Sequence, residues 1–500
     1  MSKDIRMDRD ALLRYYLKYP DKFKLAMHAI GFRVPQLRSL VHKLPYELLE
    51  RIFIFSVAPS ADADERWRRR QCARLEYVFG LTRVCAVWRR VALNAKPLWN
   101  LNGVAIRVPG HWIHSPLAAE MFLERCARLP VSFHIAPDPT RKDLSLKIAG
   151  LEHIIETISR TAERWESLSI TLEDAEHEVD ALEKIPADRL DNLERLNLIM
   201  SNGGRQWRGG NGLTGFQHAP RLRDVILRLN GTPNTYLFVL VPWTQLTHLV
   251  LEYDHPTSVL RAIISCTNLV SASIATRQWD CMFPTGAPPT MASTQVPHLE
   301  NLDILIRMHY TTGEGEYLGP FLRCIEAPAL KFLSLELDFW EIQDAPEDWE
   351  LPTCAMALGF FLWRAPRVED FRTIDCFTSD MLPVLLFAPA LTRLDFRDQP
   401  VFDDFFAVLK CEEGGQPVVP KLEVLELTNV GDDYSEAGVE AMIASRWWGN
   451  DAQPESPAVA RLRRVKLWNE YTPPKSFTPE FEQTMKKFKS QGLDVRGFYF

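Results

Sequence analysis

The chain lacks paired cysteines and long hydrophobic runs. Its nine cysteines lie singly along 500 residues, with no Cys-x-x-Cys pair, so a disulfide framework is disfavoured and reduced thiols of the cytoplasm or nucleus are expected. The longest apolar runs, such as Tyr236 to Val241, are far shorter than the roughly 20 residues that cross a bilayer. The first ten residues are charged and have no apolar signal core. These absences predict a cytoplasmic or nuclear protein that does not enter a membrane.

An excess of basic charge is missing too. The chain carries 58 basic and 65 acidic residues, for a net charge of −7, which argues against nucleic acid as a main partner. Hydrophobic residues make up 46% and charged residues 25%, the ordinary composition of a globular protein. A sizeable core is therefore expected.

Catalytic and cofactor motifs are also absent. The glycine-rich segment 203–210 lacks the Lys-Ser/Thr pair of a phosphate-binding loop, which favours a loop between repeats. His111 and His114 are three residues apart, but Pro109 and Gly110 beside them argue for a loop, and no further zinc ligands stand close. The sequence therefore predicts no cofactor, no metal and no enzymatic activity. A hidden enzyme would need a convergent acid–base cluster in a deep pocket.

Two other features admit two readings each. The run Arg66-Trp67-Arg68-Arg69-Arg70 could be a nuclear-import or phosphate-binding patch, but the acidic residues just before it favour a solvated loop. Trp207, Trp447 and Trp448 could be exposed recognition anchors. Burial against neighbouring repeats is the favoured interpretation for these tryptophans.

The most informative pattern lies between residues 44 and 99. It reads Leu44-Pro45-Tyr46-Glu47-Leu48-Leu49-Glu50-Arg51-Ile52-Phe53, then Val84-Cys85-Ala86-Val87-Trp88, then Pro97-Leu98-Trp99. Pro45 suits the first helical position. Leu48 and Ile52 are four apart, as are Leu49 and Phe53, so one helix carries two apolar rows. Val84, Val87, Trp88 and Val91 predict a second apolar stripe. Two such short helices have more apolar surface than they can bury in each other, so a partner is expected.

In this order the three pieces resemble an F-box, the helical module that docks a protein onto the Skp-type adaptor of a cullin ubiquitin ligase. The resemblance implies an F-box at 41–103, with an insertion at 56–80 as in expanded fungal F-box families, preceded by a helical segment at 1–40. It also implies contacts to the adaptor from the side chains of Leu44, Pro45, Leu48, Ile52, Val84 and Trp88. Trp88 is expected mainly to pack the two helices together.

A second pattern, Leu-x-x-Leu-x-Leu, recurs after the F-box. Clear frames begin at Leu193, Leu222, Leu246, Leu299, Leu330, Leu391, Leu422 and Leu462, and weaker ones at Trp165, Leu269 and Val368. Six are preceded by Ala-Pro or Val-Pro, and successive frames begin roughly 23 to 40 residues apart, which covers and exceeds the leucine-rich-repeat period. The alternation at the end of each frame predicts a strand with one buried face. Chance recurrence in a leucine-rich chain is the alternative, and the shared proline favours a true array.

Helix-like stretches separate the frames. They are Ser258 to Ser265, Leu318 to Ile325, Cys354 to Trp363, Met381 to Phe387 and Glu436 to Ser445. Nearer the F-box, Ala118 to Cys126 and Leu151 to Ser167 predict further amphipathic helices. The fold class expected is therefore α/β: a short helical F-box, then an irregular leucine-rich-repeat-like solenoid of parallel strands and helices over 104–500.

The resemblance implies a substrate-recognition subunit of an SCF-type cullin ubiquitin ligase, with the adaptor and cullin as partners and an unknown target protein bound by the solenoid. A non-ligase scaffold built from the same parts is the alternative, and copurification of a cullin would separate the two. Charges on the strands vary, as Arg393, Arg397 and Lys466 illustrate, which suits recognition of a protein surface. Reversing these three charges is expected to leave the fold intact.

Overall fold

The computed structural model describes most of the chain after residue 43 and divides it into two compact units. One unit comprises Met1–Ala105 and Glu120–Leu129, the other Ile106–Ala119 and Pro130–Phe500. The described residues are 44–57, 77–100, 104–108, 116–126, 128–137, 143–173, 175–200, 213–229, 239–253, 255–276, 293–308, 318–339, 355–375, 379–412, 415–448, 459–469 and 477–497. The predicted segment 1–40, the arginine run 66–70, His111, His114, the stretch 203–210 and Trp207 lie outside them.

The first unit is helical. Its described elements are α4 (Tyr46–Val57), a helical segment at 77–84, α6 (Ala86–Asn94), α7 (Lys96–Asn100) and the greater part of α8 (Pro116–Cys126). Helix α4 begins at Tyr46, and the carbonyl of Pro45 accepts hydrogen bonds from the N–H groups of Leu48 and Leu49, both at 3.1 Å. Pro45 therefore lies one position before the first helical residue.

The prediction of one apolar helix running from Val84 to Val91 is wrong. Val84 ends the helical segment 77–84, and Cys85 stands between that segment and α6 in an extended conformation. The Cys85 thiol accepts a hydrogen bond from the backbone N–H of Trp88 at 3.4 Å, which caps the start of α6. Val84 and Trp88 consequently belong to different helices.

The second unit is built on one parallel sheet whose strands follow chain order. Within the described residues the sheet has 14 strands, in the order β1 to β7, β9 and β11 to β16; β8 (Thr294–Gln295) and β10 (Ile325–Glu326) pair separately. The strands are β1 (Val104–Val108), β2 (Val131–Pro137), β3 (Trp165–Leu172), β4 (Arg195–Met200), β5 (Asp224–Leu229), β6 (His248–Tyr253), β7 (Ser271–Thr276), β9 (Asn301–Met308), β11 (Phe332–Phe339), β12 (Asp370–Ile374), β13 (Arg393–Arg397), β14 (Val424–Thr428), β15 (Arg464–Trp468) and β16 (Asp494–Arg496). All eleven leucine frames form strands of this sheet, so the predicted α/β array of parallel strands and helices is confirmed.

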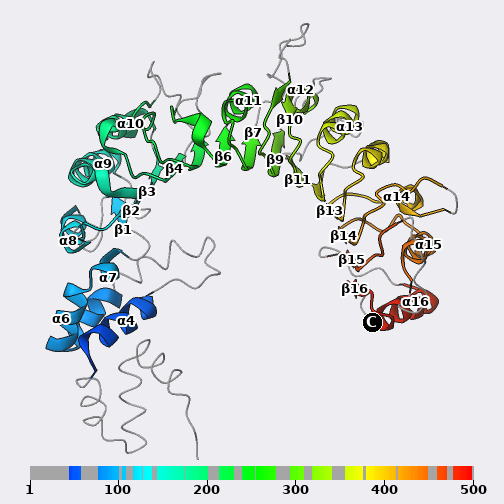
Figure 1. Ribbon diagram of the computed structural model, residues 1–500, viewed down its shortest axis with the longest axis horizontal. Helices are drawn as coiled ribbons and strands as arrows, with labels where there is room; N and C mark the ends of the chain where they lie inside the picture. The colour runs from blue at the N-terminus through cyan, green and yellow to red at the C-terminus, as the bar shows by residue number, and fades with distance from the viewer. Residues whose placement is uncertain are drawn as a thin grey trace, which may run out of the picture. The chain divides into compact units, whose positions relative to one another are not determined.

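The register of the sheet follows the frames. The middle apolar residue of each frame pairs with its counterpart in the next, from Leu168 through Leu196, Val225 and Leu249 to Val465. These side chains are at most about 1% exposed, so one face of the sheet is a continuous apolar layer. The helices from α9 to α16 lie along that face (Figure 1). We call the opposite side of the sheet the open face.

Each Ala-Pro or Val-Pro step forms a tight turn into its strand. The carbonyl of the residue before Pro accepts the N–H of the frame's first residue, as between Ala327 and Leu330 at 3.1 Å and Ala388 and Leu391 at 3.2 Å. Proline suits the second position of such a turn because its φ is already fixed there. The same turn also forms without proline, from Cys266 to Leu269 at 3.2 Å.

The helices between the frames agree in place with the sequence pattern and differ in detail. Those expected around 258–265, 354–363, 381–387 and 436–445 appear as α11 (Pro256–Ser265), α13 (Ala355–Arg364), the 3-10 helix η7 (Ser379–Phe387) and α15 (Glu436–Arg446). The helix expected at 318–325 is shorter, α12 (Gly319–Arg323), because Ile325 and Glu326 form β10.

One expected helix is displaced. Instead of Leu151 to Ser167, α9 spans Leu144–Ser159. The Asp143 carboxylate accepts the N–H of Leu146 at 3.2 Å and so starts the helix early. Trp165 to Ser167 belong to β3, where the fully buried Trp165 pairs with Val131. Helices α10 (Ala175–Glu183), α14 (Asp403–Leu409) and α16 (Pro479–Ser490) were not anticipated.

A buried arginine joins three segments near the C-terminal end of the array. Arg446 is 0% exposed, and its guanidinium donates to the carbonyls of Leu409, Val418 and Val419 at 2.5, 2.5 and 3.1 Å. Burial lowers its pKa. Trp447 beside it is 7% exposed, with Arg461 stacked 3.9 Å from its ring centroid. The expected burial of Trp447 is confirmed, while Trp448 is half-buried.

Candidate functional site

Helix α4 presents an apolar stripe to solvent. Leu48, Ile52 and Phe55 are spaced four and three residues apart, so they share one helical face. Leu48 is 45% exposed, Phe55 is 85% exposed and Ile52 is half-buried. We call these three residues the α4 stripe. Because the three side chains share one accessible face, they form an apolar patch of the kind found at protein contacts.

The neighbouring face of α4 fixes the stripe to the rest of its unit. Leu49 and Phe53 are 2% and 1% exposed, and the Phe53 ring lies 4.8 Å from that of Trp88, centroid to centroid. The indole N–H of Trp99 donates a hydrogen bond to the carbonyl of Ala92 at 2.7 Å and so connects α7 to α6. These buried side chains pack α4 against α6 and leave the stripe on the outer side of the helix.

A polar contact ties the end of α4 to the segment 77–84. Tyr77 forms a side-chain hydrogen bond with Ser56, and burial raises the pKa of the Tyr77 phenol despite that bond. Ser56 in turn donates to the carbonyl of Phe53 at 2.8 Å. The contact connects the end of α4 to the segment 77–84, and both of its residues belong to the predicted insertion 56–80.

The six predicted adaptor contacts fall into two groups. Pro45, Leu48 and Val84 are exposed, and Leu44 and Ile52 are half-exposed, so all five are accessible. Trp88 is only 7% exposed and lies against Phe53. It therefore supports the surface from within rather than lining it.

Phe55 was missed by sequence reasoning. It lies two residues beyond the part of the pattern that resembles an F-box. Its spacing of three from Ile52 and seven from Leu48 was the available signal, since that spacing extends the same helical face.

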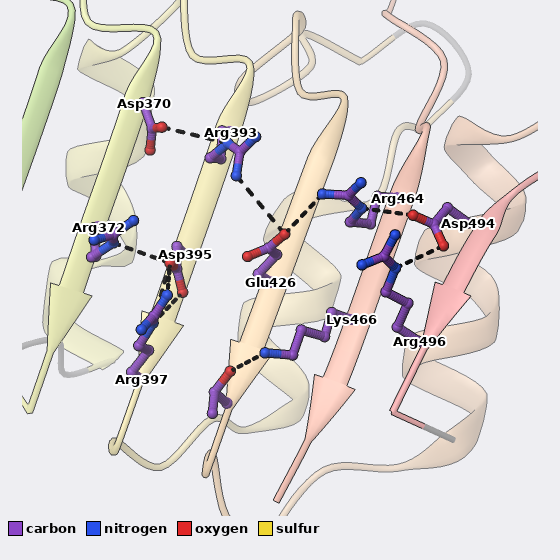
Figure 2. A network of polar contacts seen from close by, with 11 residues as sticks. Asp370, Arg372, Arg393, Asp395, Arg397, Glu426, Arg464, Lys466, Asp494 and Arg496 are labelled. Carbon is purple, nitrogen blue, oxygen red and sulfur yellow. Dashed lines mark hydrogen bonds and ion pairs between the residues drawn. The ribbon is translucent and has the colours of Figure 1, made fainter. Parts of the chain in front are cut away.

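The open face of the array carries a chain of alternating charges across five strands (Figure 2). The Arg393 guanidinium lies 3.4 Å from Asp370 on β12 and 3.9 Å from Glu426 on β14. Glu426 is 3.4 Å from Arg464 on β15, which contacts Asp494 on β16 at 2.7 Å. Hydrogen bonds from Arg496 and Arg464 lower the pKa of the Asp494 carboxyl. Each charge thus has a partner on a neighbouring strand.

A second cluster centres on a buried carboxylate. The Asp395 side chain is 1% exposed and accepts two hydrogen bonds from Arg397, at 2.7 and 2.9 Å, and one from Arg372 at 3.1 Å. Hydrogen bonding to Asp395 raises the pKa of Arg397. Arg393 and Arg397 are therefore structural ion-pair members as well as surface groups. The structure argues against the expectation that these charges can be reversed without effect on the fold, because reversal at Arg397 would leave Asp395 with Arg372 as its remaining partner and place a second carboxylate beside it.

Acidic groups gather beside these arginines, with Glu336 in the middle of β11 and Asp375 directly after β12. Burial, with Asp303 and Asp338 nearby, raises the pKa of Glu336. Burial, then Asp398 and Glu336, raise the pKa of Asp375 to about 6. The open face therefore carries carboxylates around Glu336 and Asp375 next to the ion-paired arginines of β12 to β16.

Within the described ranges, no group of three or more His, Cys, Asp or Glu side chains is arranged to hold a metal ion. None of the described helices has the length and apolar character needed to cross a membrane. A shallow pocket lies at the edge of the sheet where β5 to β9 begin, and its lining includes Arg223, Gln245, Asn268 and His298. The side-chain amide of Gln245 donates a hydrogen bond to the backbone carbonyl of Leu222, and that of Asn268 donates to the carbonyl of Thr244. These contacts hold the turns in place.

Comparison with known proteins adds little. No protein-family model matches the chain, and no curated protein does so. A solved structure of a protein from Bacteroides fragilis is 10% identical over 69% of this chain and 68% of its own, with a TM-score of 0.27. The complex of Rad7 and Elc1 in yeast is 12% identical over 94% of this chain and 96% of its own, with a TM-score of 0.25. At these TM-scores neither likeness carries weight for fold or function.

Proposed function

We propose that this chain is the substrate-recognition subunit of an SCF-type cullin ubiquitin ligase. In this proposal the helical unit docks onto a Skp-type adaptor through the α4 stripe, and the array binds a target protein. The role is non-enzymatic: the chain raises the local concentration of the target beside the ligase, in the cytoplasm or nucleus, and other subunits transfer ubiquitin.

One observation supports the docking step most strongly. The sequence that resembles an F-box folds into a helix whose inner row, Leu49 and Phe53, is buried, while its outer row, the α4 stripe, stays open. A helix with two apolar rows needs two partners. The unit supplies Trp88 for the first row, and an adaptor would supply a surface for the second.

The test is the affinity of the full chain for a purified Skp-type adaptor, measured by calorimetry. Burying a fully exposed leucine contributes about 1.5–3 kcal/mol, and Leu48 and Ile52 are already partly covered. The Leu48→Ala, Ile52→Ala double variant should still bind at least tenfold more weakly, equivalent to about 1.4 kcal/mol. Leu146→Ala is the matched control, because Leu146 is 57% exposed on α9 of the other unit. Undiminished binding by the double variant would sink the F-box assignment.

Target recognition is proposed for the open face of β12 to β16. Lys466 offers the cleanest probe, because its ammonium contacts the neutral hydroxyl of Thr428 at 3.3 Å. Lys466→Glu should change the proteins that copurify while adaptor binding stays the same. An unchanged set of proteins would place recognition elsewhere.

The alternative, a scaffold that uses the same docking surface outside a ligase, shares the adaptor contact. The two proposals differ in whether a cullin is part of the complex. Copurification of a cullin with the wild-type chain, and its loss with the α4-stripe variant, would favour the ligase. Adaptor binding without a cullin would favour the scaffold.

A further inference from the structure

A second bare apolar surface lies on the helix layer of the array. On α13, Met356, Phe360 and Trp363 are 74%, 55% and 67% exposed. They are four and three residues apart and so share one helical face. On the neighbouring η7, Leu386 and Phe387 are 59% and 41% exposed. We call these five residues the α13 surface.

A glycine makes this surface continuous between the two helices. A Cβ atom at Gly359 would lie 3.1 and 3.2 Å from two ring carbons of Phe387, closer than such contacts normally allow. Gly359 lies inside α13, where glycine costs about 1 kcal/mol relative to alanine. Its lack of a side chain lets the Phe387 ring rest on the helix beside Phe360. The aromatic groups of both helices therefore form one surface.

The size of the α13 surface fits a protein interface. At their exposed fractions, the five side chains present roughly 500 Å² of apolar area. The largest apolar patch on a typical monomer is about 300–600 Å² and is often functional. A stable dimer covers about 800 Å² on each partner, and this surface would form the larger part of such an interface.

The charge on α13 is compatible with a second copy of the same chain as the occupant. A two-fold contact brings each side chain near its own symmetry mate, so like charges in the contact would repel. Helix α13 has one charged residue, Arg364. Its guanidinium is held on its own chain by the carbonyls of Leu322 and Arg323, at 2.8 and 3.1 Å. Nothing charged on this helix opposes a symmetric approach.

We propose that the α13 surface is the interface of a symmetric dimer of this chain. Helix α13 would meet α13 of the second copy, with Met356, Phe360 and Trp363 at the centre and η7 at the edge. Flat aromatic rings and a flexible methionine can interdigitate with copies of themselves. This inference is independent of the proposed adaptor contact, which uses the helical unit.

Sedimentation equilibrium of the full chain, from nanomolar to tens of micromolar, tests the proposal. The wild-type mass should rise from one chain to two and then stop, because a two-fold interface is closed. Phe360→Asp with Trp363→Asp should remain at the mass of one chain. Leu146→Asp makes the same change at an equally exposed leucine on α9 and should dimerise normally. A monomeric wild type, growth beyond two chains, or a dimer in the double variant would overturn the proposal.

Crosslinking supplies a second test that leaves the surface apolar. A photoreactive phenylalanine at position 360, in an equal mixture of unlabelled and ¹⁵N-labelled chains, should give mixed-isotope crosslinks that join the α13 peptides of two chains. Crosslinks confined to a single chain would contradict the dimer even if the aspartate variants failed to fold.

Discussion

At the level of single residues, burial separates the side chains that build the helical unit from those that it offers to a partner. Phe53 is 1% exposed against Trp88, whereas Phe55, two residues along the same helix, is 85% exposed. Truncating a buried tryptophan leaves a large cavity, while truncating an exposed phenylalanine leaves the interior intact. Truncation of Trp88 should therefore reduce the stability of the helical unit, whereas truncation of Phe55 should leave that stability unchanged.

Trp88→Ala should unfold the helical unit rather than only trim its affinity for an adaptor. The expected loss is about 3–5 kcal/mol, comparable to the whole stability of a small module. Limited proteolysis should show new cleavage between residues 44 and 100. Phe55→Ala is the control and should leave the cleavage pattern unchanged. If Trp88→Ala adds no cleavage sites, the packing role of Trp88 is refuted.

The contribution of a single carboxylate, Asp375, to the stability of the array should depend on pH. The folded pKa of Asp375, about 6, lies above its ordinary value of 3.8, so the folded state binds this proton more readily than the unfolded state. The resulting penalty is absent well below pH 4, grows between about pH 4 and 6 and is complete above that window. Asp375→Asn should therefore stabilise the array at pH 7, with a gain that disappears by about pH 4. Asparagine also tolerates the positive φ of 55° at this position.

Asp494→Asn is the control of opposite sign. Arg496 and Arg464 lower the pKa of Asp494, so its contribution is favourable at pH 7 and is lost as pH falls through the folded pKa. Denaturant midpoints measured across this range should move in opposite directions for the two variants. Destabilisation at pH 7 by Asp375→Asn would contradict the raised pKa.

At the level of elements, ion pairs between neighbouring strands decide which charges of the open face can be changed. Asp395 on β13 is held by Arg372 of β12 and by Arg397 of its own strand. Lys466 on β15 contacts the hydroxyl of Thr428 on β14. The first set neutralises a buried carboxylate, and the second involves no buried charge.

Arg397→Glu should therefore destabilise the array by about 3 kcal/mol, because it removes the bidentate partner of Asp395 and adds a second carboxylate beside it. Lys466→Glu should change stability by no more than about 0.5 kcal/mol. Urea unfolding monitored by circular dichroism would compare them directly. Equal midpoints for the two variants would show that the Asp395 cluster contributes little to the fold.

At the level of the whole molecule, the parallel array was predictable because its signal is repeated. Even the weak frames at Trp165, Leu269 and Val368 became strands β3, β7 and β12. Helix boundaries were less predictable, since the cap at Asp143 and the turn at Cys85 depend on single polar side chains. Ion pairs such as Arg393 with Asp370 could not be predicted. They depend on which residues of different repeats face each other, and the repeats have unequal lengths.

The candidate docking surface was predictable in part for the same reason. The four-residue spacing placed Leu48 and Ile52 on one row, and the structure keeps both accessible. The sequence could not show that Trp88 is covered while Phe55 is bare, because burial is decided by packing between separate helices.

Hydrogen–deuterium exchange of the full chain, with and without a purified Skp-type adaptor, would locate the adaptor on the chain. An adaptor on the α4 stripe should suppress local opening of the helix beneath it. We expect slower exchange in peptides covering residues 44–57 and unchanged exchange in β11 to β16. Slowed exchange confined to the array, or no change anywhere at saturating adaptor, would contradict docking through the α4 stripe.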